Sequence, residues 1–252
     1  MSRTATPRLA VNDLQRAFGG VQAVRGVSFA LDAGEILALI GPNGAGKTTC
    51  FNLLNGQLRP DAGTVRLDGM DIVGLPPRRI WRMGVGRTFQ ITATFASMTV
   101  RENVQMVLLS ARRRLFGLWT PAASCFRDEA TALLERVGMG AQAERPCGVL
   151  AYGDLKRVEL AMALAGDPKI LLMDEPTAGM APGERQELMA LTSSLVRERG
   201  LAVLFTEHDM DVVFGHASRI IVLDRGQLIA EGTPDAVRAD PRVQAVYLGG
   251  AA

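Results

Sequence analysis

The glycine-rich segment from Gly41 to Thr48 constrains the fold of this chain more than any other feature. It reads Gly-Pro-Asn-Gly-Ala-Gly-Lys-Thr and matches the pattern GxxxxGK followed by Ser or Thr. A nearly continuous apolar run at 35–40 precedes it, and a stretch with helical apolar spacing at 48–58 follows it. A strand, a glycine loop and a helix in this order direct backbone N–H groups at a phosphate. In that context Lys47 neutralises phosphate charge and Thr48 ligates Mg²⁺; an ordinary glycine-rich turn is the weaker alternative.

Three further apolar runs have the length of buried strands. They lie at 169–174, 201–206 and 219–224, and helical stretches such as 184–199 separate them. Strands that alternate with helices indicate an α/β fold, a mostly parallel sheet flanked by helices. Residues 9–31 alternate apolar and polar side chains, which predicts an additional N-terminal antiparallel β layer.

The stretch from about 91 to 166 has no comparable buried run, and its segments look helical. We therefore predict a single domain over residues 1–252. Its nucleotide-binding α/β core combines 1–90 with 167–252, and the helical stretch is a subdomain inserted into that core.

Composition limits the classes of protein to which the chain can belong. With 252 residues, of which 48% are hydrophobic, it can bury one full α/β core, and its net charge of +2 gives no reason to expect a nucleic-acid partner. Its three cysteines include no CxxC pair, which is typical of reduced thiols in a cytosolic protein. The chain shows neither an apolar run of about 20 residues nor an apolar leader. A role at a membrane would therefore depend on partner chains.

The acidic pair Asp174-Glu175 is the second strong signal. It ends the run Ile-Leu-Leu-Met, so its carboxylates lie at the C-terminal edge of the sheet, where α/β folds bind ligands. Asp174 is predicted to hold Mg²⁺ directly or through water, and Glu175 to polarise the attacking water as a general base. A strand that merely ends in solvated acids is the alternative, and the phosphate loop disfavours it.

Three weaker signals fit the same chemistry. His208 follows the run at 201–206 and so lies at the same sheet edge, although a lone histidine is usually structural or exposed. Gln90 ends Arg-Thr-Phe-Gln, where it can orient water or contact Mg²⁺. Gly153, in Leu-Ala-Tyr-Gly-Asp, lets backbone approach a phosphate, although an ordinary first helical turn explains it equally well.

In this order and spacing, these segments resemble the ABC ATPase family over almost the whole chain. The resemblance implies catalytic roles for Glu175, His208, Gln90 and Lys47, and Mg²⁺ ligation by Thr48, Gln90 and Asp174. It implies that Phe18 stacks on adenine, the alternative being a plain core phenylalanine. The implied ATP-binding residues are Phe18, Gly41, Pro42, Asn43, Gly44, Ala45, Gly46, Lys47, Thr48, Thr49, Tyr152 and Gly153.

The chain departs from the family pattern in two places. The family signature LSGGQ reads LAYGD here, so Ala151 replaces a serine and Asp154 replaces a glutamine. The family segment SALD reads Ala-Gly-Met-Ala at 178–181 and lacks its aspartate. These departures concern contacts across a dimer of cassettes, and they leave the predicted phosphate, Mg²⁺ and water residues intact. Hydrolysis is therefore still expected.

Within the family, the chain is most similar to ATPase subunits of branched-chain amino acid-type importers. Four segments carry this similarity: 87–90, 150–153, 206–210 and the ending 240–249. It implies a homo- or heterodimer with a second ABC ATPase subunit, two membrane-spanning permease subunits, a periplasmic solute-binding protein, and a peripheral place on the cytoplasmic face of the bacterial inner membrane. Relatives also carry urea, short amides and aromatic acids, and the ATPase chain does not contact the cargo.

Three other functions are weighed against this one. An ABC exporter is disfavoured because the chain carries no fused membrane domain. A non-transport ABC ATPase of DNA repair or translation generally has tandem cassettes or long coiled coils, whereas this sequence has one cassette and no heptad run. A GTPase switch needs an NKxD-like motif, and none follows the phosphate loop in the sequence.

The segment 110–124 combines three consecutive arginines with Leu115, Phe116 and Trp119. It is either a basic turn whose apolar residues join the core of the helical subdomain, or part of a surface that docks on the membrane subunits. In the resembling importers, the helical subdomain and the groove near Gln90 receive helices from those subunits, which favours docking at or beside this segment.

Overall fold

The structure is a computed structural model that describes residues 6–88, 94–112 and 125–248. Gln90 lies outside these ranges, and so do Leu115, Phe116 and Trp119, so the structure does not test the roles expected of them. In the described part of the chain, no helix combines the length and the apolar character needed to cross a bilayer.

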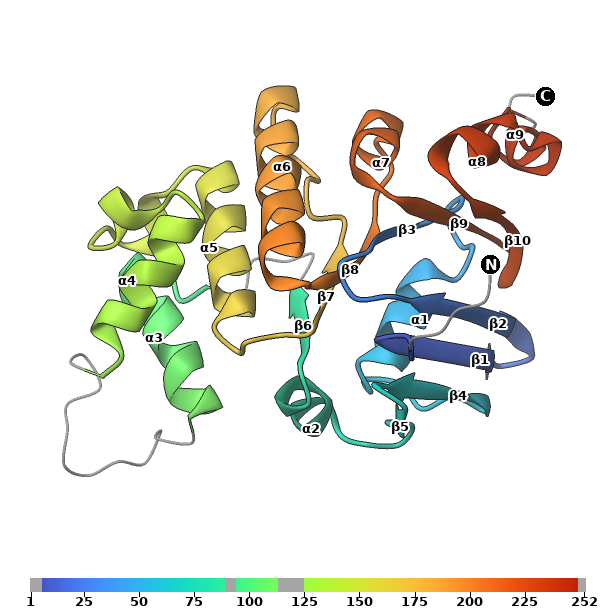
Figure 1. The fold of residues 1–252 in the computed structure, drawn as a ribbon, viewed down its shortest axis with the longest axis horizontal. Coiled ribbons are helices and arrows are strands. Elements are labelled where there is room, and N and C mark those ends of the chain that lie inside the picture. Colours follow the sequence, from blue (N-terminus) through green and yellow to red (C-terminus); the bar gives the residue numbers. More distant parts are fainter. Residues whose placement is uncertain (1–5, 89–93, 113–124, 249–252) are drawn as a thin grey trace.

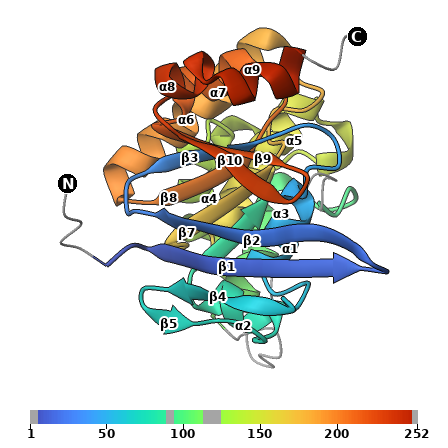
Figure 2. The same cartoon turned by 90° about the vertical axis from the view of Figure 1, so that its right-hand side faces the viewer.

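A six-stranded sheet with strand order β10-β9-β3-β8-β7-β6 runs through the molecule (Figures 1 and 2). Its strands are β3 (Ile36–Ile40), β6 (Val85–Thr88), β7 (Ile170–Asp174), β8 (Ala202–Thr206), β9 (Arg219–Asp224) and β10 (Gln227–Gly232). All pairs are parallel except β10 with β9. The four predicted buried runs form the four adjacent strands β9, β3, β8 and β7, which confirms the predicted parallel sheet. We did not predict β6 and β10.

A second, antiparallel sheet has the order β2-β1-β4-β5. Its strands are β1 (Leu9–Phe18), β2 (Val21–Leu31), β4 (Ala62–Leu67) and β5 (Met70–Asp71). β1 and β2 pair from Leu9 with Leu31 to Phe18 with Val21, as a long hairpin. The predicted N-terminal antiparallel layer is therefore confirmed, and β4 and β5 extend it.

Alternate residues of β3 face two hydrophobic cores. Leu37 and Leu39 pack with side chains of the antiparallel sheet and with Phe51 of α1 (Lys47–Leu54). Ala38 and Ile40 belong to the core that includes the helices on the other face. Strands covered on both faces are apolar throughout, which explains why every residue of β3, β7 and β8 is buried. The remaining helices of the α/β part are α2 (Pro77–Arg82), α6 (Pro182–Arg199), α7 (Met210–His216), α8 (Pro234–Ala239) and α9 (Pro241–Leu248).

Three helices between β6 and β7 in the sequence pack against one another and lie to one side of the sheet (Figure 1). These helices, called the helical lobe below, are α3 (Val100–Ala111), α4 (Arg127–Arg136) and α5 (Tyr152–Leu164), with short 3-10 turns at Gly140–Gln142 and Cys147–Val149. A capping box starts α3: the Thr99 side chain accepts from the backbone N–H of Glu102, and the Glu102 carboxylate accepts from that of Thr99.

Candidate functional site

The predicted phosphate loop joins the end of β3 to the start of α1, as the motif requires. Two of its glycines have backbone conformations that exclude a side chain. A Cβ on Gly41 would lie 2.1 Å from the carbonyl oxygen of Leu223, and one on Gly46, whose φ is +105°, would lie 2.3 Å from that of Ala23. The loop is thus held tightly between the sheet and the β1–β2 hairpin, with α1 beginning at Lys47.

The Lys47 side chain is buried within this loop, with 8% exposure. Its Nζ donates to the carbonyl oxygens of Gly41, at 2.6 Å, and Pro42, at 3.1 Å. Burial lowers the pKa of the Lys47 ammonium, and the carboxylates of Glu175 and Asp174 oppose that shift without cancelling it. The loop therefore folds around the Lys47 ammonium, which also interacts electrostatically with Glu175 and Asp174. Thr48 is exposed on the first turn of α1.

Asp174 ends β7, and its carboxylate is fixed at both oxygens. Oδ1 accepts a hydrogen bond of 2.8 Å from the hydroxyl of Thr206, at the end of the neighbouring strand β8. Oδ2 forms an ion pair of 3.2 Å with Arg87 of β6. The side chain of Asp174 is only 6% exposed, so this carboxylate relies on protein partners rather than water.

Glu175 and His208 lie opposite each other at the edge of the sheet. The Nε2 atom of His208 is 3.0 Å from Oε1 of Glu175. Glu175 has a φ of +48°, which is costly for a residue with a side chain, and its N–H contacts the carbonyl oxygen and the hydroxyl of Thr206. The Glu175 carboxylate faces His208 at this edge, and a carboxylate is a group that can accept a proton from water.

Glu207 is buried beside His208 and was not among the residues predicted from the sequence. It is 4% exposed, and its Oε1 accepts from both the N–H and the hydroxyl of Thr177, at 2.8 and 2.7 Å. Its Oε2 accepts from the N–H of His208 at 3.2 Å. Glu207 therefore ties the turn after Glu175 to the turn that carries His208. Nothing in the sequence distinguishes it from a solvated acid between Thr206 and His208.

Replacing Glu207 by glutamine is expected to lower the free energy of unfolding by about 1–3 kcal/mol. The NH₂ group that replaces one carboxylate oxygen is itself a donor, and it would face the N–H or hydroxyl donors that the oxygen accepted from. Urea unfolding measures the change. Glu198→Gln is the matched control, since Glu198 is exposed and accepts only from Ser194 in the described structure. If the free energy of unfolding falls no more for Glu207→Gln than for Glu198→Gln, the hydrogen bonds of Glu207 do not stabilise the fold.

Phe18 ends β1 and is 43% exposed, so it is not a core residue. The guanidinium of Arg16 lies over its ring, 4.9 Å from the centroid, and pairs with Asp61 at 2.6 Å. Asp61 also accepts from the N–H of Ala17 at 2.8 Å. An exposed aromatic ring backed by a fixed cation is a suitable platform for stacking a purine base.

Tyr152 and Gly153 begin α5, in the helical lobe, and Figure 1 shows this helix far from α1. Gly153 is buried against the carboxylate of Glu184 on α6, and a Cβ there would lie 3.0 Å from it. The Tyr152 ring lies beside Gly179 and the Lys156 ammonium. The structure thus brings Lys47, Asp174, Glu175 and His208 to one edge of the sheet, and it places Tyr152 and Gly153 elsewhere.

The C-terminal helix α9 also contacts the phosphate loop. Ala245 and Val246 line a hollow together with Pro42, Asn43, Gly44 and Ala45. Burial raises the pKa of the Tyr247 hydroxyl to about 12, although the donating N–H of Gly41 lowers it. We did not predict this contact, because the sequence 240–249 indicated only a similarity to branched-chain amino acid-type importer subunits.

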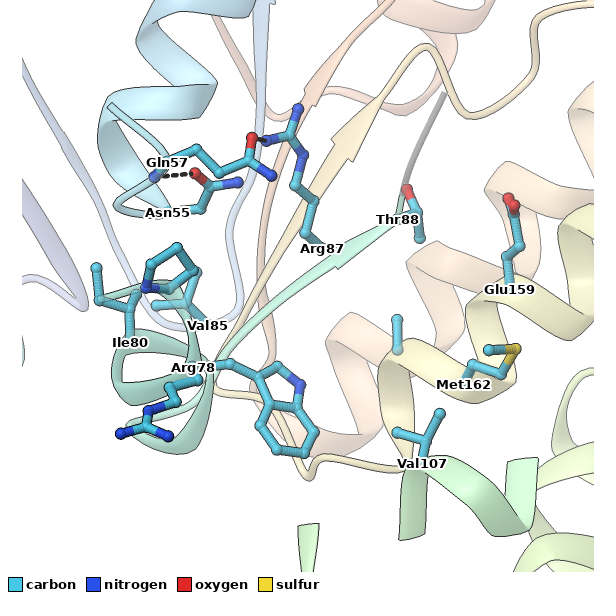
Figure 3. A pocket seen from close by; sticks show the side chains of 13 residues that line it. Asn55, Gln57, Arg78, Ile80, Val85, Arg87, Thr88, Val107, Glu159 and Met162 are labelled. Carbon is cyan, nitrogen blue, oxygen red and sulfur yellow. Dashed lines mark hydrogen bonds between the residues drawn. The ribbon is translucent and has the colours of Figure 1, made fainter. Parts of the chain in front are cut away.

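A groove of about 330 Å³ separates β6 and α2 from α3 and α5 (Figure 3). Val107 and Met162 line it from the helical lobe, and Gln57 and Arg87 line it from the opposite side (Figure 3). Other lining residues are Asn55, Pro77, Arg78, Ile80, Trp81, Val85, Thr88, Glu159 and Ala163. A shallower hollow that includes Phe95 continues it across Trp81 and Val107. This surface, called the groove below, is largely apolar with an arginine-bearing rim.

The donor set at the sheet edge fits Mg²⁺ rather than a metal held wholly by protein. Thr48 offers a hydroxyl and Asp174 a carboxylate, the hard oxygen ligands that Mg²⁺ prefers. Within the described ranges, no three His, Cys, Asp or Glu side chains are placed to hold a metal ion. Mg²⁺ commonly uses one or two protein oxygens and completes its shell with water and phosphate oxygens.

Comparison with known proteins is consistent with this site. Residues 24–178 match the family described as ABC transporter, and residues 227–252 match the one described as branched-chain amino acid ATP-binding cassette transporter. The high-affinity branched-chain amino acid transport ATP-binding protein LivG of Salmonella typhimurium is 44% identical over 96% of this chain and 98% of its own.

Solved structures agree with the fold. The ADP conformation of MJ1267, an ATP-binding cassette of an ABC transporter, superposes with a TM-score of 0.87 at 32% identity and covers 97% of this chain and 100% of its own. A dimeric post-hydrolysis state of the cassette MJ0796, bound to ADP and Pi, gives a TM-score of 0.75 at 25% identity, with coverages of 90% and 98%.

Proposed function

The chain belongs to the ATP-binding subunits of ABC transporters, and we propose that it powers an importer of branched-chain amino acids or related small amides. The observation that carries the choice of importer is the match of residues 227–252 to the branched-chain amino acid family, because it covers a part of the chain outside the general ABC match. The identity with LivG along nearly the whole chain supports it.

In the proposed nucleotide site, the phosphates of ATP lie in the loop from Gly41 to Gly46. The N–H groups of the loop and of the first turn of α1, which includes Thr49, donate to phosphate oxygens. Lys47 neutralises charge on the β- and γ-phosphates. Phe18 stacks on adenine, with Arg16 fixed behind its ring.

For hydrolysis, Glu175 takes a proton from the water that attacks the γ-phosphorus, while the bond to the β-phosphate oxygen breaks. His208, 3.0 Å from Glu175, holds that carboxylate in place. Thr48, Asp174 and Gln90 are the proposed Mg²⁺ ligands, and bound Mg²⁺ neutralises charge that develops on the phosphates. Lys47 does the same from within the loop.

Tyr152 and Gly153 act on the nucleotide of a second ABC ATPase subunit in this proposal. Within one chain they pack against α6 and Gly179, away from the phosphate loop. A head-to-tail dimer, identical or with a related subunit, would place them at the partner's nucleotide. The relative MJ0796 has been solved as a dimer. ATP binding then closes the dimer, and hydrolysis reopens it.

The groove is the proposed docking site for a helix of a membrane-spanning permease subunit, and the two grooves of the proposed dimer serve two permease subunits. Its apolar floor suits the apolar face of a short helix, and its place between the α/β part and the helical lobe lets motion of the lobe reach the permease. The chain is then a peripheral subunit on the cytoplasmic face of the bacterial inner membrane, linked only indirectly to a periplasmic solute-binding protein, and it has no nucleic-acid partner.

Copurification with the membrane subunits and an uptake assay test the function. Reconstituted vesicles should take up leucine, isoleucine or valine, or one of a panel of short amides, in an ATP-dependent manner when the binding protein is added. An assembly that hydrolyses ATP but takes up none of these compounds would contradict the proposed cargo class.

A charge in the groove should impair assembly with the permease subunits. Met162→Lys places an ammonium on its apolar wall, and we expect the amount of copurified permease to fall at least about tenfold, because a charge on this wall must lose water when a helix docks. Leu191→Lys is the matched control, since Leu191 is also half-buried but lies on α6 outside the groove. Nucleotide binding verifies folding, and equal assembly of both variants would remove the groove from the docking surface.

A further inference from the structure

Arg87 contacts residues of both the proposed nucleotide site and the groove. It lies on β6, in parallel register with β7, and only 11% of its side chain is exposed. Nη2 pairs with Oδ2 of Asp174 at 3.2 Å. Nη1 donates to the side-chain oxygens of Asn52, at 2.8 Å, and Gln57, at 3.0 Å (Figure 3 shows the contact with Gln57).

One end of this network contacts Asp174, one of the proposed Mg²⁺ ligands. Because the Thr206 hydroxyl occupies Oδ1 of Asp174, Arg87 completes the set of partners that orient the carboxylate. Asn52 lies four residues after Thr48 on α1, so the two share a helix face. Arg87 therefore bridges the helix that carries Thr48 and the strand that carries Asp174.

The other end of the network lies in the groove. Both Arg87 and Gln57 line it, so a helix seated there changes the surroundings of the guanidinium (Figure 3). Burial lowers the pKa of Arg87 and Asp174 raises it again, but an arginine stays charged in proteins. Its fork of donors lets one rigid group hold three acceptors at once.

We propose that Arg87 is a positioning residue that fixes Asp174 relative to Thr48 for Mg²⁺ binding and transmits the filling of the groove to the nucleotide site. The first half rests on the site residues proposed above, and the second on the proposed docking of a permease helix. Neither half depends on which compound is transported.

The first test measures how much Mg²⁺ strengthens nucleotide binding. The affinity of the full chain for a fluorescent ATP analogue is determined with and without Mg²⁺, in a Glu175→Gln background that prevents turnover. The ratio of the two affinities reports the coupling between metal and nucleotide. Adding Arg87→Gln should reduce this ratio about tenfold, because a buried charge-assisted contact is lost, while the affinity without Mg²⁺ stays within about twofold.

Two further variants make this test decisive. Arg87→Lys keeps the charge but not the fork, so it should recover part of the ratio, and it carries the test if Arg87→Gln does not fold. Arg82→Gln is the control, an exposed arginine on α2 that does not line the groove. An unchanged ratio in folded Arg87→Gln would overturn the role in Mg²⁺ binding, as would an equal loss of affinity with and without Mg²⁺. If Arg87→Gln does not fold, an unchanged ratio in Arg87→Lys overturns it instead.

The second test uses the assembly with its membrane subunits. Stimulation of ATPase activity by the substrate-loaded binding protein is compared with the activity of the same assembly without it. Arg87→Gln should lower the ratio several-fold, beyond its effect on the unstimulated rate. An unchanged ratio would overturn the transmission role. If the wild-type assembly transports nothing in the panel, the proposed cargo is wrong, and the Mg²⁺ test still decides the role of Arg87 in the site.

Discussion

Replacing Lys47 by alanine is expected to weaken nucleotide binding and to abolish ATP turnover. Its ammonium is the one positive charge within the sequence 41–48, and the loop folds around it through the carbonyl oxygens of Gly41 and Pro42. Electrostatic stabilisation is strongest where water is excluded, and Lys47 is only 8% exposed. Removing the charge that opposes the β- and γ-phosphates should reduce the rate by about 10²–10³-fold or more.

Steady-state ATPase assays and binding of a fluorescent nucleotide measure the two effects. Lys169→Ala provides the matched control, because that lysine forms an ion pair with Asp68 at 2.7 Å but is 46% exposed, and such pairs contribute little. Activity of Lys47→Ala within a few-fold of wild type would contradict the assigned role.

The convergence of residues at the sheet edge was predictable from the sequence. Buried apolar runs identified four strands, and parallel strands bring their carboxyl ends to one edge. Asp174 ends such a run, and Glu175 and His208 follow one, so their approach to Lys47 needed no knowledge of side-chain packing. The glycines of the loop were equally predictable, because the GxxxxGK pattern contains them. In the structure, a Cβ on Gly41 or Gly46 would clash with backbone.

The residues that support the site were not predictable in the same way. β6 is short and contains Gly86, Arg87 and Thr88, so it lacks the apolar run by which its neighbours were recognised. Burial of Arg87 and Glu207 depends on partners far away in the sequence, and a polar residue gives no local sign that it is buried. The φ of +48° at Glu175 has no sequence signal either, because the residue is not glycine.

The role of the turn at Tyr152 and Gly153 could not be predicted for a different reason. A small residue at the start of α5 has an adequate explanation within the chain, namely close packing against Glu184. A role toward a nucleotide depends on a second subunit, and the geometry of a single chain holds no information about that subunit. The resemblance alone supplies the role, so it stays a prediction.

Replacing Glu175 by glutamine is expected to separate ATP binding from hydrolysis. The backbone N–H of Glu175 is held by Thr206, and its Oε1 lies 3.0 Å from Nε2 of His208, an acceptor position that the amide oxygen of glutamine can keep. What the amide lacks is the capacity to take a proton from water at neutral pH. Hydrolysis should therefore fall by about 10²–10⁴-fold while nucleotide affinity stays close to that of wild type.

The same variant tests whether ATP closes a dimer. With hydrolysis blocked, bound ATP persists, and the chain should associate with itself or with a related ATPase subunit in an ATP-dependent manner, as light scattering or size exclusion can show. Glu187→Gln is the control, because this exposed carboxylate pairs with Arg157 of α5. Turnover equal to that of wild type would remove Glu175 as the base. Slow turnover without association with either partner would leave Glu175 as the base and count against the dimer, because trapped ATP is the condition that most favours closure.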